Sequence, residues 1–307
     1  MKIKNLSNGQ EDMFLITVEI NKGINETINI LVDGGKSGFR CQEALKGLGK
    51  TKLDYIVLTH IDSDHIQGLL KNIKTSEEHQ DTIIVYNKFV NGLISYNQAE
   101  KFEKLIKNNK VIVSYKEYQE NSSEILFLSV NQRRKLIYED NKVYITFLAP
   151  NKDKVQKLYN YYDFYKTNGK KRSDDAEIVN RSSIMFILEY HRNAILMAGD
   201  GYISDIITSI EQLADSSQTM YPIRKFDLIK LPHHGSDDNN CCLEQLIQYT
   251  PCNKFVITNG NRGSVNISEK LKEILFGKNV YISEECEKFK GMNYIITKEN
   301  EVITDEY

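Results

Sequence analysis

Short apolar runs alternate with amphipathic stretches along the first half of the chain, which is the pattern of an α/β protein. Apolar runs predict buried strands, whereas apolar residues at a spacing of three and four predict helices with one face packed inward. On these grounds we expect strands at 15–20, 27–32, 55–58 and 82–86, helices at 66–73 and 98–108, and hairpins across the polar stretch 111–145.

The second half continues the alternation. Strands are expected from 180, 194 and 227, at 254–258, and as three short pieces at 279–282, 293–297 and 301–303, with helices at 243–249 and 267–276. We find no internal repeat, low-complexity tract or linker, so residues 1–307 are expected to form one domain.

The segment 59–68 concentrates imidazoles and carboxylates just past the predicted strand 55–58. Within six positions it carries His60, Asp62, Asp64 and His65. Such groups are costly to bury unless they are paired or bound to a metal, and imidazole with carboxylate suits zinc, manganese or iron. The alternative is a polar helix start capped by Asp62 or Asp64, but it leaves both histidines unexplained. We therefore favour a metal site at this strand end.

Three further apolar strands end in residues of the same kind. One ends in Asp33 and two glycines, a tight turn where backbone can approach a ligand. The others end in Asp200 and in the pair His233 and His234. Four of the six histidines thus lie at two strand ends, which indicates one shared site rather than scattered polar residues.

These motifs, in this order, resemble those of the metallo-β-lactamase superfamily. Its usual first motif, His-x-His-x-Asp-His, here reads His-x-Asp-x-Asp-His with Asp62 in place of the second histidine. That variant is similar to the hydrolase domain of the bacterial competence DNA-uptake channel (ComEC) and its stand-alone relatives. The resemblance implies an α/β fold, a four-layer αββα sandwich, and phosphodiester hydrolysis. The other matching segments are 9–12, 32–35, 180–189, 199–200 and 233–236.

Two departures from the family pattern bear on the metals. No Gly-His-Thr-like motif is present, so the usual third histidine of the first metal site is missing. The segment 261–268 also lacks the histidine of the branch's late motif. Together with Asp62 these changes make the first site more anionic, which favours manganese or magnesium there over zinc.

The resemblance implies two divalent ions, zinc or manganese, with magnesium as a further option. Two such ions about 3.5–4 Å apart lower the pKa of a bound water toward 7 and stabilise the attacking and departing oxygens. The implied ligands are Asp64, His65 and Asp200 for one ion and His60 and Asp62 for the second, with Asp200 as the bridge and His234 as a further ligand.

The remaining polar residues of these motifs receive other roles. Asp64 is expected to take a proton from the bridging water as well as to bind metal. His233 either donates to a phosphoryl oxygen or leaving group, or is simply a packed histidine. Asp33 is expected to orient the first motif through hydrogen bonds, and Lys230 has no assigned role.

A basic and aromatic stretch at 152–172 is the main candidate for substrate contact, since cations with aromatics are typical of single-stranded nucleic-acid binding. It lies in a possible insertion at 151–175. The alternative is an amphipathic helix that packs through Val155, Leu158 and Tyr162. Both can hold together. The candidate contact residues are Lys157, Tyr161, Lys170, Lys171 and Arg172.

Composition limits the partners. The net charge is −2 and the pI about 6.3, which argues against a wholly basic nucleic-acid surface. No apolar run approaches the roughly 18 residues of a membrane span, and no export leader is recognisable. The five cysteines show no Cys-x-x-Cys spacing and are expected to be reduced thiols of a cytoplasmic protein.

Three functions remain in view. We favour a metal-dependent phosphodiesterase or nuclease acting on nucleic acid or a small phosphodiester. The alternative is a hydrolase of a small (phospho)ester, such as phosphorylcholine or a nucleotide signal, for which the acidic net charge speaks. The third is a degenerate domain that binds metal weakly and serves as a partner-binding module. Whether a protein partner or a second copy is involved stays open.

Overall fold

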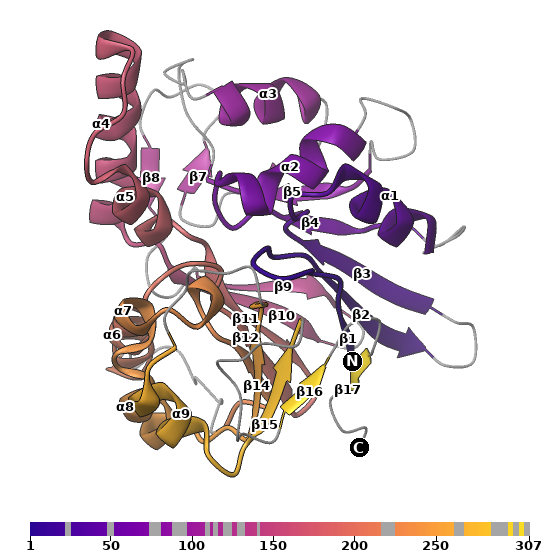
Figure 1. Ribbon diagram of the computed structural model, residues 1–307. Coiled ribbons are helices and arrows are strands. Elements are labelled where there is room, and N and C mark those ends of the chain that lie inside the picture. The colour runs from indigo at the N-terminus through magenta and orange to yellow at the C-terminus, as the bar shows by residue number, and fades with distance from the viewer. Residues whose placement is uncertain are drawn as a thin grey trace.

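A computed structural model shows a four-layer αββα sandwich, in which two mixed sheets pack face to face and helices cover their outer faces (Figure 1). This is the fold class that the sequence predicts. The structure describes residues 1–21, 26–47, 52–73, 81–87, 97–107, 111–112, 116–118, 125–127, 133–139, 142–215, 225–260, 267–283, 294–296 and 301–303.

The first sheet has the strand order β17-β1-β2-β3-β4-β5-β6. Neighbours from β17 to β3 pair antiparallel, and those from β3 to β6 pair parallel. Helices α1, α2 and α3 follow the parallel strands. The bounds are β1 Lys2–Asn5, β2 Phe14–Asn21, β3 Glu26–Val32, α1 Gly38–Gly47, β4 Tyr55–Val57, α2 Ser63–Asn72, β5 Ile83–Val85, α3 Asn97–Leu105, β6 Val111–Ile112 and β17 Glu301–Ile303.

The second sheet has the order β16-β15-β14-β13-β12-β11-β10-β9, antiparallel from β9 to β12 and parallel from β12 to β16. Helices α6, α8 and α9 cover its outer face. The bounds are β9 Arg134–Tyr138, β10 Val143–Ala149, β11 Met185–Tyr190, β12 Asn193–Met197, α6 Ile203–Asp215, β13 Leu228–Lys230, the 3-10 turn η3 His233–Gly235, α7 Asp237–Asn240, α8 Leu243–Tyr249, β14 Lys254–Ile257, α9 Glu269–Leu275, β15 Asn279–Ile282 and β16 Tyr294–Ile296.

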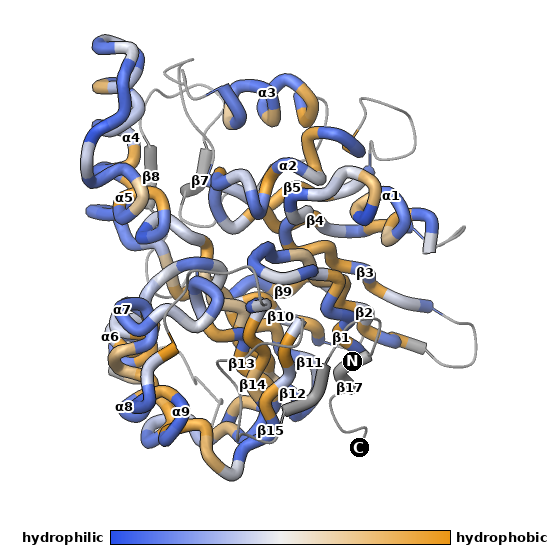
Figure 2. The backbone as a smooth tube through the Cα atoms, in the orientation of Figure 1, coloured by the Kyte–Doolittle hydropathy of each residue, from blue (hydrophilic) through white to orange (hydrophobic). Residues whose placement is uncertain are grey.

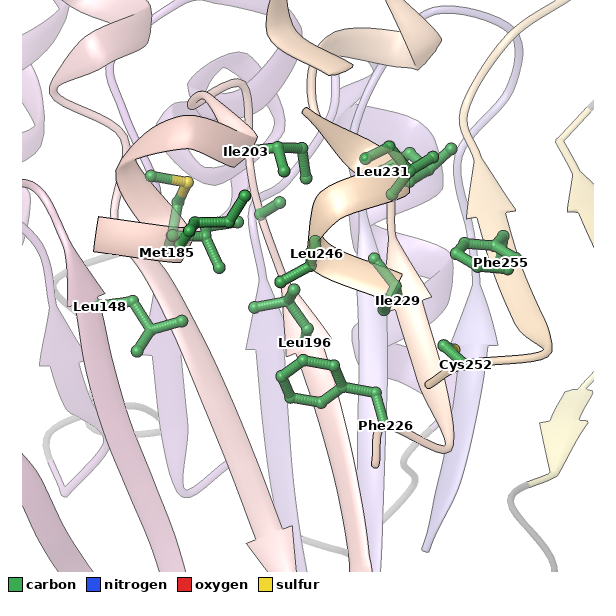
Figure 3. Close-up of a cluster of buried hydrophobic side chains, with 14 of the residues drawn as sticks. Leu148, Met185, Leu196, Ile203, Phe226, Ile229, Leu231, Leu246, Cys252 and Phe255 are labelled. Carbon is green, nitrogen blue, oxygen red and sulfur yellow. The ribbon is translucent and has the colours of Figure 1, made fainter. Parts of the chain in front are cut away.

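Three apolar layers hold these elements together. One layer lies between the two sheets. A second lies between the first sheet and helices α1, α2 and α3. The third lies between the second sheet and helices α6, α8 and α9, and it includes Leu196, Ile203 and Phe226 (Figure 3). The central strands are mainly hydrophobic along their length, whereas the outer helices alternate polar and apolar turns (Figure 2). This is the burial that the hydrophobic pattern predicts.

Two helices, α4 (Lys152–Asn168) and α5 (Asp175–Arg181), occupy the expected insertion and join the layer beside α2 and α3. Val155, Leu158 and Tyr162 are buried, so the predicted packing of this helix is confirmed. A small hairpin forms from β7 (Lys116–Tyr118) and β8 (Ile125–Phe127). The segment from 180 is helical before β11 begins at Met185, because Asn180 and Arg181 close α5.

Some predictions lie outside the described residues: the turn at 22–25, residues 261–266, and Cys286. The strand β1 was not expected, since Lys2–Asn5 carries a single apolar side chain, Ile3. The single-domain prediction stays a prediction. Among the described helices none combines the length and apolar character that crossing a bilayer requires.

The close contact between α2 and the turn after β3 gives a stability prediction. A Cβ at Gly68 would lie 1.8 Å from the Gly34 carbonyl oxygen, so Gly68→Ala should lower the free energy of unfolding by about 1–3 kcal/mol through overpacking. Gly47→Ala, where a Cβ meets nothing within 4 Å, is the matched control and should be neutral or slightly stabilising. Urea unfolding measures both, and equal effects would contradict this packing.

Candidate metal centre

Four strand ends, two from each sheet, bring the predicted ligands together. Asp33 follows β3, residues 59–65 connect β4 to α2, Asp200 follows β12, and the pair 233–234 follows β13. Asp62 occupies the N-cap position of α2, but its side chain makes no capping hydrogen bond. The capping alternative therefore does not account for this carboxylate.

Asp200 lies at the middle of the cluster. Its Oδ1 is 3.4 Å from His65 Nε2, and its Oδ2 is 3.9 Å from the Nε2 atoms of His60, His233 and His234. Asp64 approaches from the other side, with Oδ2 3.5 Å from His234 Nε2. Oxygen and nitrogen donors thus converge on one small volume from both sheets.

Five of the six predicted ligands form two overlapping triplets. In each of two triplets the candidate ligand atoms lie within 4.8 Å of one another. His65 belongs to both triplets, which the sequence did not predict. Asp62 belongs to neither, although its Oδ2 is 3.7 Å from His60 Nε2. The triplets are His60, His65 and Asp200, and Asp64, His65 and His234.

Four buried atoms of this cluster have no hydrogen-bond partner: the Nε2 atoms of His60, His65 and His234, and Oδ1 of Asp200. An unsatisfied buried polar atom costs about 1–3 kcal/mol, so four in one place are unlike a merely structural polar core. A divalent cation would satisfy all of them, because imidazole nitrogen and carboxylate oxygen are its ordinary ligands. The residues present fit a metal.

Asp33 sets the tautomers of two histidines. Its Oδ2 accepts from His65 Nδ1 at 2.7 Å and from Thr59 Oγ1 at 2.7 Å, and its Oδ1 accepts from the Thr59 amide. Because Thr59 donates its only hydroxyl proton to the carboxylate, its oxygen accepts from His60 Nδ1 at 3.1 Å. Both imidazoles therefore carry their proton on Nδ1 and turn the Nε2 lone pair toward Asp200.

A second hydroxyl relay acts on His234. Thr258 Oγ1 donates to Asp12 Oδ1 at 2.6 Å and so accepts from His234 Nδ1 at 2.9 Å. His233 is held by Asn239, whose amide nitrogen donates to the carbonyls of Asp200 and Gly201, which leaves its Oδ1 to accept from His233 Nδ1 at 3.1 Å. All four histidines of the centre thus aim Nε2 inward.

Three residues of the centre have left-handed backbone. The φ angles are 56° at Asp33, 47° at His233 and 54° at His234. Outside glycine this conformation costs roughly 1–2 kcal/mol per residue, and such strain persists where surrounding contacts over-determine it. The strained pair directs two consecutive imidazoles toward Asp200, which no regular strand or helix would do.

Sequence reasoning left out two residues that the structure places beneath the cluster. Lys230 is fully buried; its Nζ contacts Asp12 Oδ2, donates to the Gly199 carbonyl at 2.9 Å, and lies 3.8 Å from Asp200 Oδ1. For Lys230 the sequence did offer a signal, because a lysine inside the apolar run 228–231 indicates a buried cation that needs a partner. For Asp12 the signal was its place in the 9–12 motif.

Charge in the cluster shifts three pKa values. Burial alone would raise the pKa of Asp64 and Asp200, but the close approach of His234 to Asp64 and the charges of the nearby His65 and His234 hold both pKa values well below the usual range. Burial alone would lower the pKa of His65, yet Asp200 and Asp33 raise it well above its usual range.

The residues expected to contact substrate lie elsewhere. Tyr161 is fully buried, with its hydroxyl 3.4 Å from Asp175 Oδ2, so its prediction as a contact residue is wrong: it belongs to the packed face of α4. Lys171 pairs with Asp175 at 3.1 Å and Arg172 with Asp174 at 2.8 Å. Lys157 and Lys170 are exposed. Figure 1 shows α4 at the upper left, outside the two sheets.

The raised pKa of His65 predicts a pH dependence of metal binding. Its imidazolium must lose the Nε2 proton to become a ligand, so the apparent affinity for Zn²⁺ should fall about tenfold per pH unit below that pKa, with close to one proton released. Asp33→Asn removes a cause of the raised pKa and should shift this decline to lower pH. Calorimetry in buffers of different ionisation enthalpy measures the released proton, and pH-independent binding would contradict the prediction.

The buried ion pair gives a second prediction. Lys230→Met leaves the Asp12 carboxylate buried without its cation and should lower the free energy of unfolding by about 3–5 kcal/mol. The double variant Asp12→Asn with Lys230→Met should recover more than half of that loss. Lys46→Met, at an exposed lysine paired with Glu43, is the control and should change stability by less than about 0.5 kcal/mol. Chemical denaturation compares all three.

Comparisons with known proteins bear on the fold. A family model described as the metallo-β-lactamase superfamily matches residues 9–100, and no curated protein matches the chain. A solved metal-dependent hydrolase of the β-lactamase superfamily is 13% identical with a TM-score of 0.50, over 92% of this chain and 95% of that one. A diphosphatase from the PhnP family is 14% identical with a TM-score of 0.42, over 83% of this chain and 85% of that one. A long form of RNase Z from yeast is 13% identical with a TM-score of 0.42, over 96% of this chain and 37% of that one. Residues 9–100 are thus similar to the metallo-β-lactamase superfamily, and the first of these structures shares the fold.

Proposed function

We propose that the chain is a metal-dependent hydrolase that cleaves phosphodiester bonds, in the manner of a phosphodiesterase or nuclease. The observation that carries this proposal is the set of four buried, unpartnered ligand atoms around Asp200. Three strand ends from two sheets, those of β4, β12 and β13, bring these atoms together, and buried polar atoms left without partners are rare in a purely structural cluster. The ComEC-like order of the motifs supports the same reaction class.

The donor set supports two cations of the harder kind. Asp64, His65 and His234 would hold one, His60 and Asp62 the other, with Asp200 between them. Two divalent ions there would lower the pKa of a bound water and stabilise the charge on the reacting phosphoryl oxygens. Carboxylates make up half of the set, which favours manganese, zinc or magnesium over softer metals.

Proton transfer falls to His233 in this proposal. Its ring is held through Nδ1, its Nε2 faces Asp200 Oδ2 at 3.9 Å, and its side chain is 34% exposed. Neutral, Nε2 accepts a proton; protonated, it donates to the oxygen that departs. Asp64 belongs to one of the triplets of candidate ligands, with Oδ2 3.5 Å from His234 Nε2, so we assign it to metal binding.

A second candidate is hydrolysis of a small phosphoester, for example a nucleotide signal or phosphorylcholine. One observation favours it: within the described residues, Lys171 and Arg172 of the expected nucleic-acid stretch pair with Asp175 and Asp174 next to them. These acidic partners lower the net positive charge of the stretch below what the sequence alone indicates.

Cleavage assays test the proposal. The substrates are single- and double-stranded DNA, RNA and bis(p-nitrophenyl) phosphate, each with added Mn²⁺ or Zn²⁺. Asp64→Ala and His65→Ala should abolish turnover, because each removes one of the candidate metal ligands. The circular dichroism spectrum of both variants should remain that of the folded wild type. His191→Ala, an exposed histidine outside the centre, is the control. Polymer cleavage would indicate a nuclease, and turnover of the small diester alone a phosphodiesterase. Full activity in both ligand variants would rule the mechanism out.

A further inference from the structure

The turn between β3 and α1 is fixed firmly against the metal centre. Gly35 has a φ of +63°, and a Cβ at Gly34 would lie 2.6 Å from the Leu69 amide nitrogen, so the chain runs too close to α2 for a side chain. Four hydrogen bonds hold the turn: Gly34 N to His65 O at 2.7 Å, Gly35 N to Asp12 O at 2.9 Å, Gly68 N to Gly35 O at 2.8 Å and Lys36 N to Glu11 Oε2 at 2.8 Å.

Lys36 follows this turn directly, and its side chain reaches a carboxylate of the centre. Its Nζ lies 3.9 Å from Asp64 Oδ2 and donates to the Gln10 carbonyl at 3.1 Å. The side chain is 55% exposed, compared with 22% for Asp64. Within the described ranges, Lys36 and Lys230 are the lysines within 4.0 Å of a carboxylate of the centre. Lys230 is enclosed, so Lys36 is the cation that faces water.

This exposed ion pair is weak and exchangeable. A solvent-exposed pair contributes little to stability, and Lys36 gives up little by leaving Asp64. When Asp64 is a metal ligand its charge is shared with the ion, so the ammonium becomes available to another anion. A lysine ammonium is a common point-charge partner of phosphate oxygens, and the fixed turn keeps it beside the reacting group.

We propose that Lys36 binds a non-bridging oxygen of the substrate and so selects anionic phosphoesters over neutral esters. The inference rests on the proposed function and adds to it the residue that recognises the negative charge of the substrate. The ammonium forms no bond to substrate other than this charge-assisted hydrogen bond. The competing explanation is a structural one, in which Lys36 only fastens the Gln10 segment to the turn.

The test compares Lys36→Gln and Lys36→Arg with wild type on an anionic and a neutral ester. For bis(p-nitrophenyl) phosphate, kcat/KM should fall about 10- to 100-fold in Lys36→Gln, the usual size of a lost hydrogen bond to a charged group. For p-nitrophenyl acetate it should change less than about twofold. Lys36→Arg, which keeps the charge, should retain most of the activity. Bound metal per chain should be unchanged, and Lys46→Gln serves as the exposed-lysine control.

Binding of inorganic phosphate to the metal-loaded protein separates this inference from the proposed function. If wild type hydrolyses neither ester but binds phosphate about tenfold more tightly than Lys36→Gln does, the inference stands while the reaction class fails. Equal losses on both esters, or loss of metal in Lys36→Gln, would show a structural role and overturn it. Unchanged phosphate affinity together with unchanged substrate preference would overturn it as well.

Discussion

The contact between Lys230 and Asp12 is the interaction on which the centre depends. Asp12 precedes β2 of the first sheet, and Lys230 ends β13 of the second, so the pair ties the two sheets together beneath the cluster. Five carboxylates meet there, at positions 12, 33, 62, 64 and 200. One ammonium and two divalent cations would balance the charge of these five carboxylates, so the proposed metals would account for so many acids in one cluster.

The two threonine relays show how a small number of hydroxyl groups organises the histidines. Thr59 and Thr258 each donate to a carboxylate and accept from an imidazole. An alanine at either position would leave the imidazole free to turn or to carry its proton on the wrong nitrogen. The relays also connect the sheets, since Thr258 follows β14 and Asp12 lies 246 positions away along the chain.

Much of this was predictable from the sequence, for a physical reason. Residues 60–65 share one turn after a strand, so their spacing alone places them together, and parallel strand ends carry Asp33, Asp200 and the 233–234 pair to the same edge. The Asp12–Lys230 contact was not predictable, because it joins two sheets whose packing a local pattern does not specify. Tyr161 was misjudged since α4 buries a face wide enough to include two adjacent tyrosines. The histidine of the Gly-His-Thr-like motif, which the chain lacks, is not replaced by another histidine among the assigned metal ligands.

The left-handed backbone of His233 and His234 lowers the stability of the fold, but it places the two imidazoles in the centre. Glycine adopts this conformation without the strain that a side chain adds, so replacing the pair by glycine relieves the turn and removes two imidazoles at once. A laboratory population of variants chosen for heat resistance alone would drift toward such replacements. Stability alone therefore does not favour histidine at these two positions. The strained backbone is tolerated because the imidazole side chains serve the function of the site.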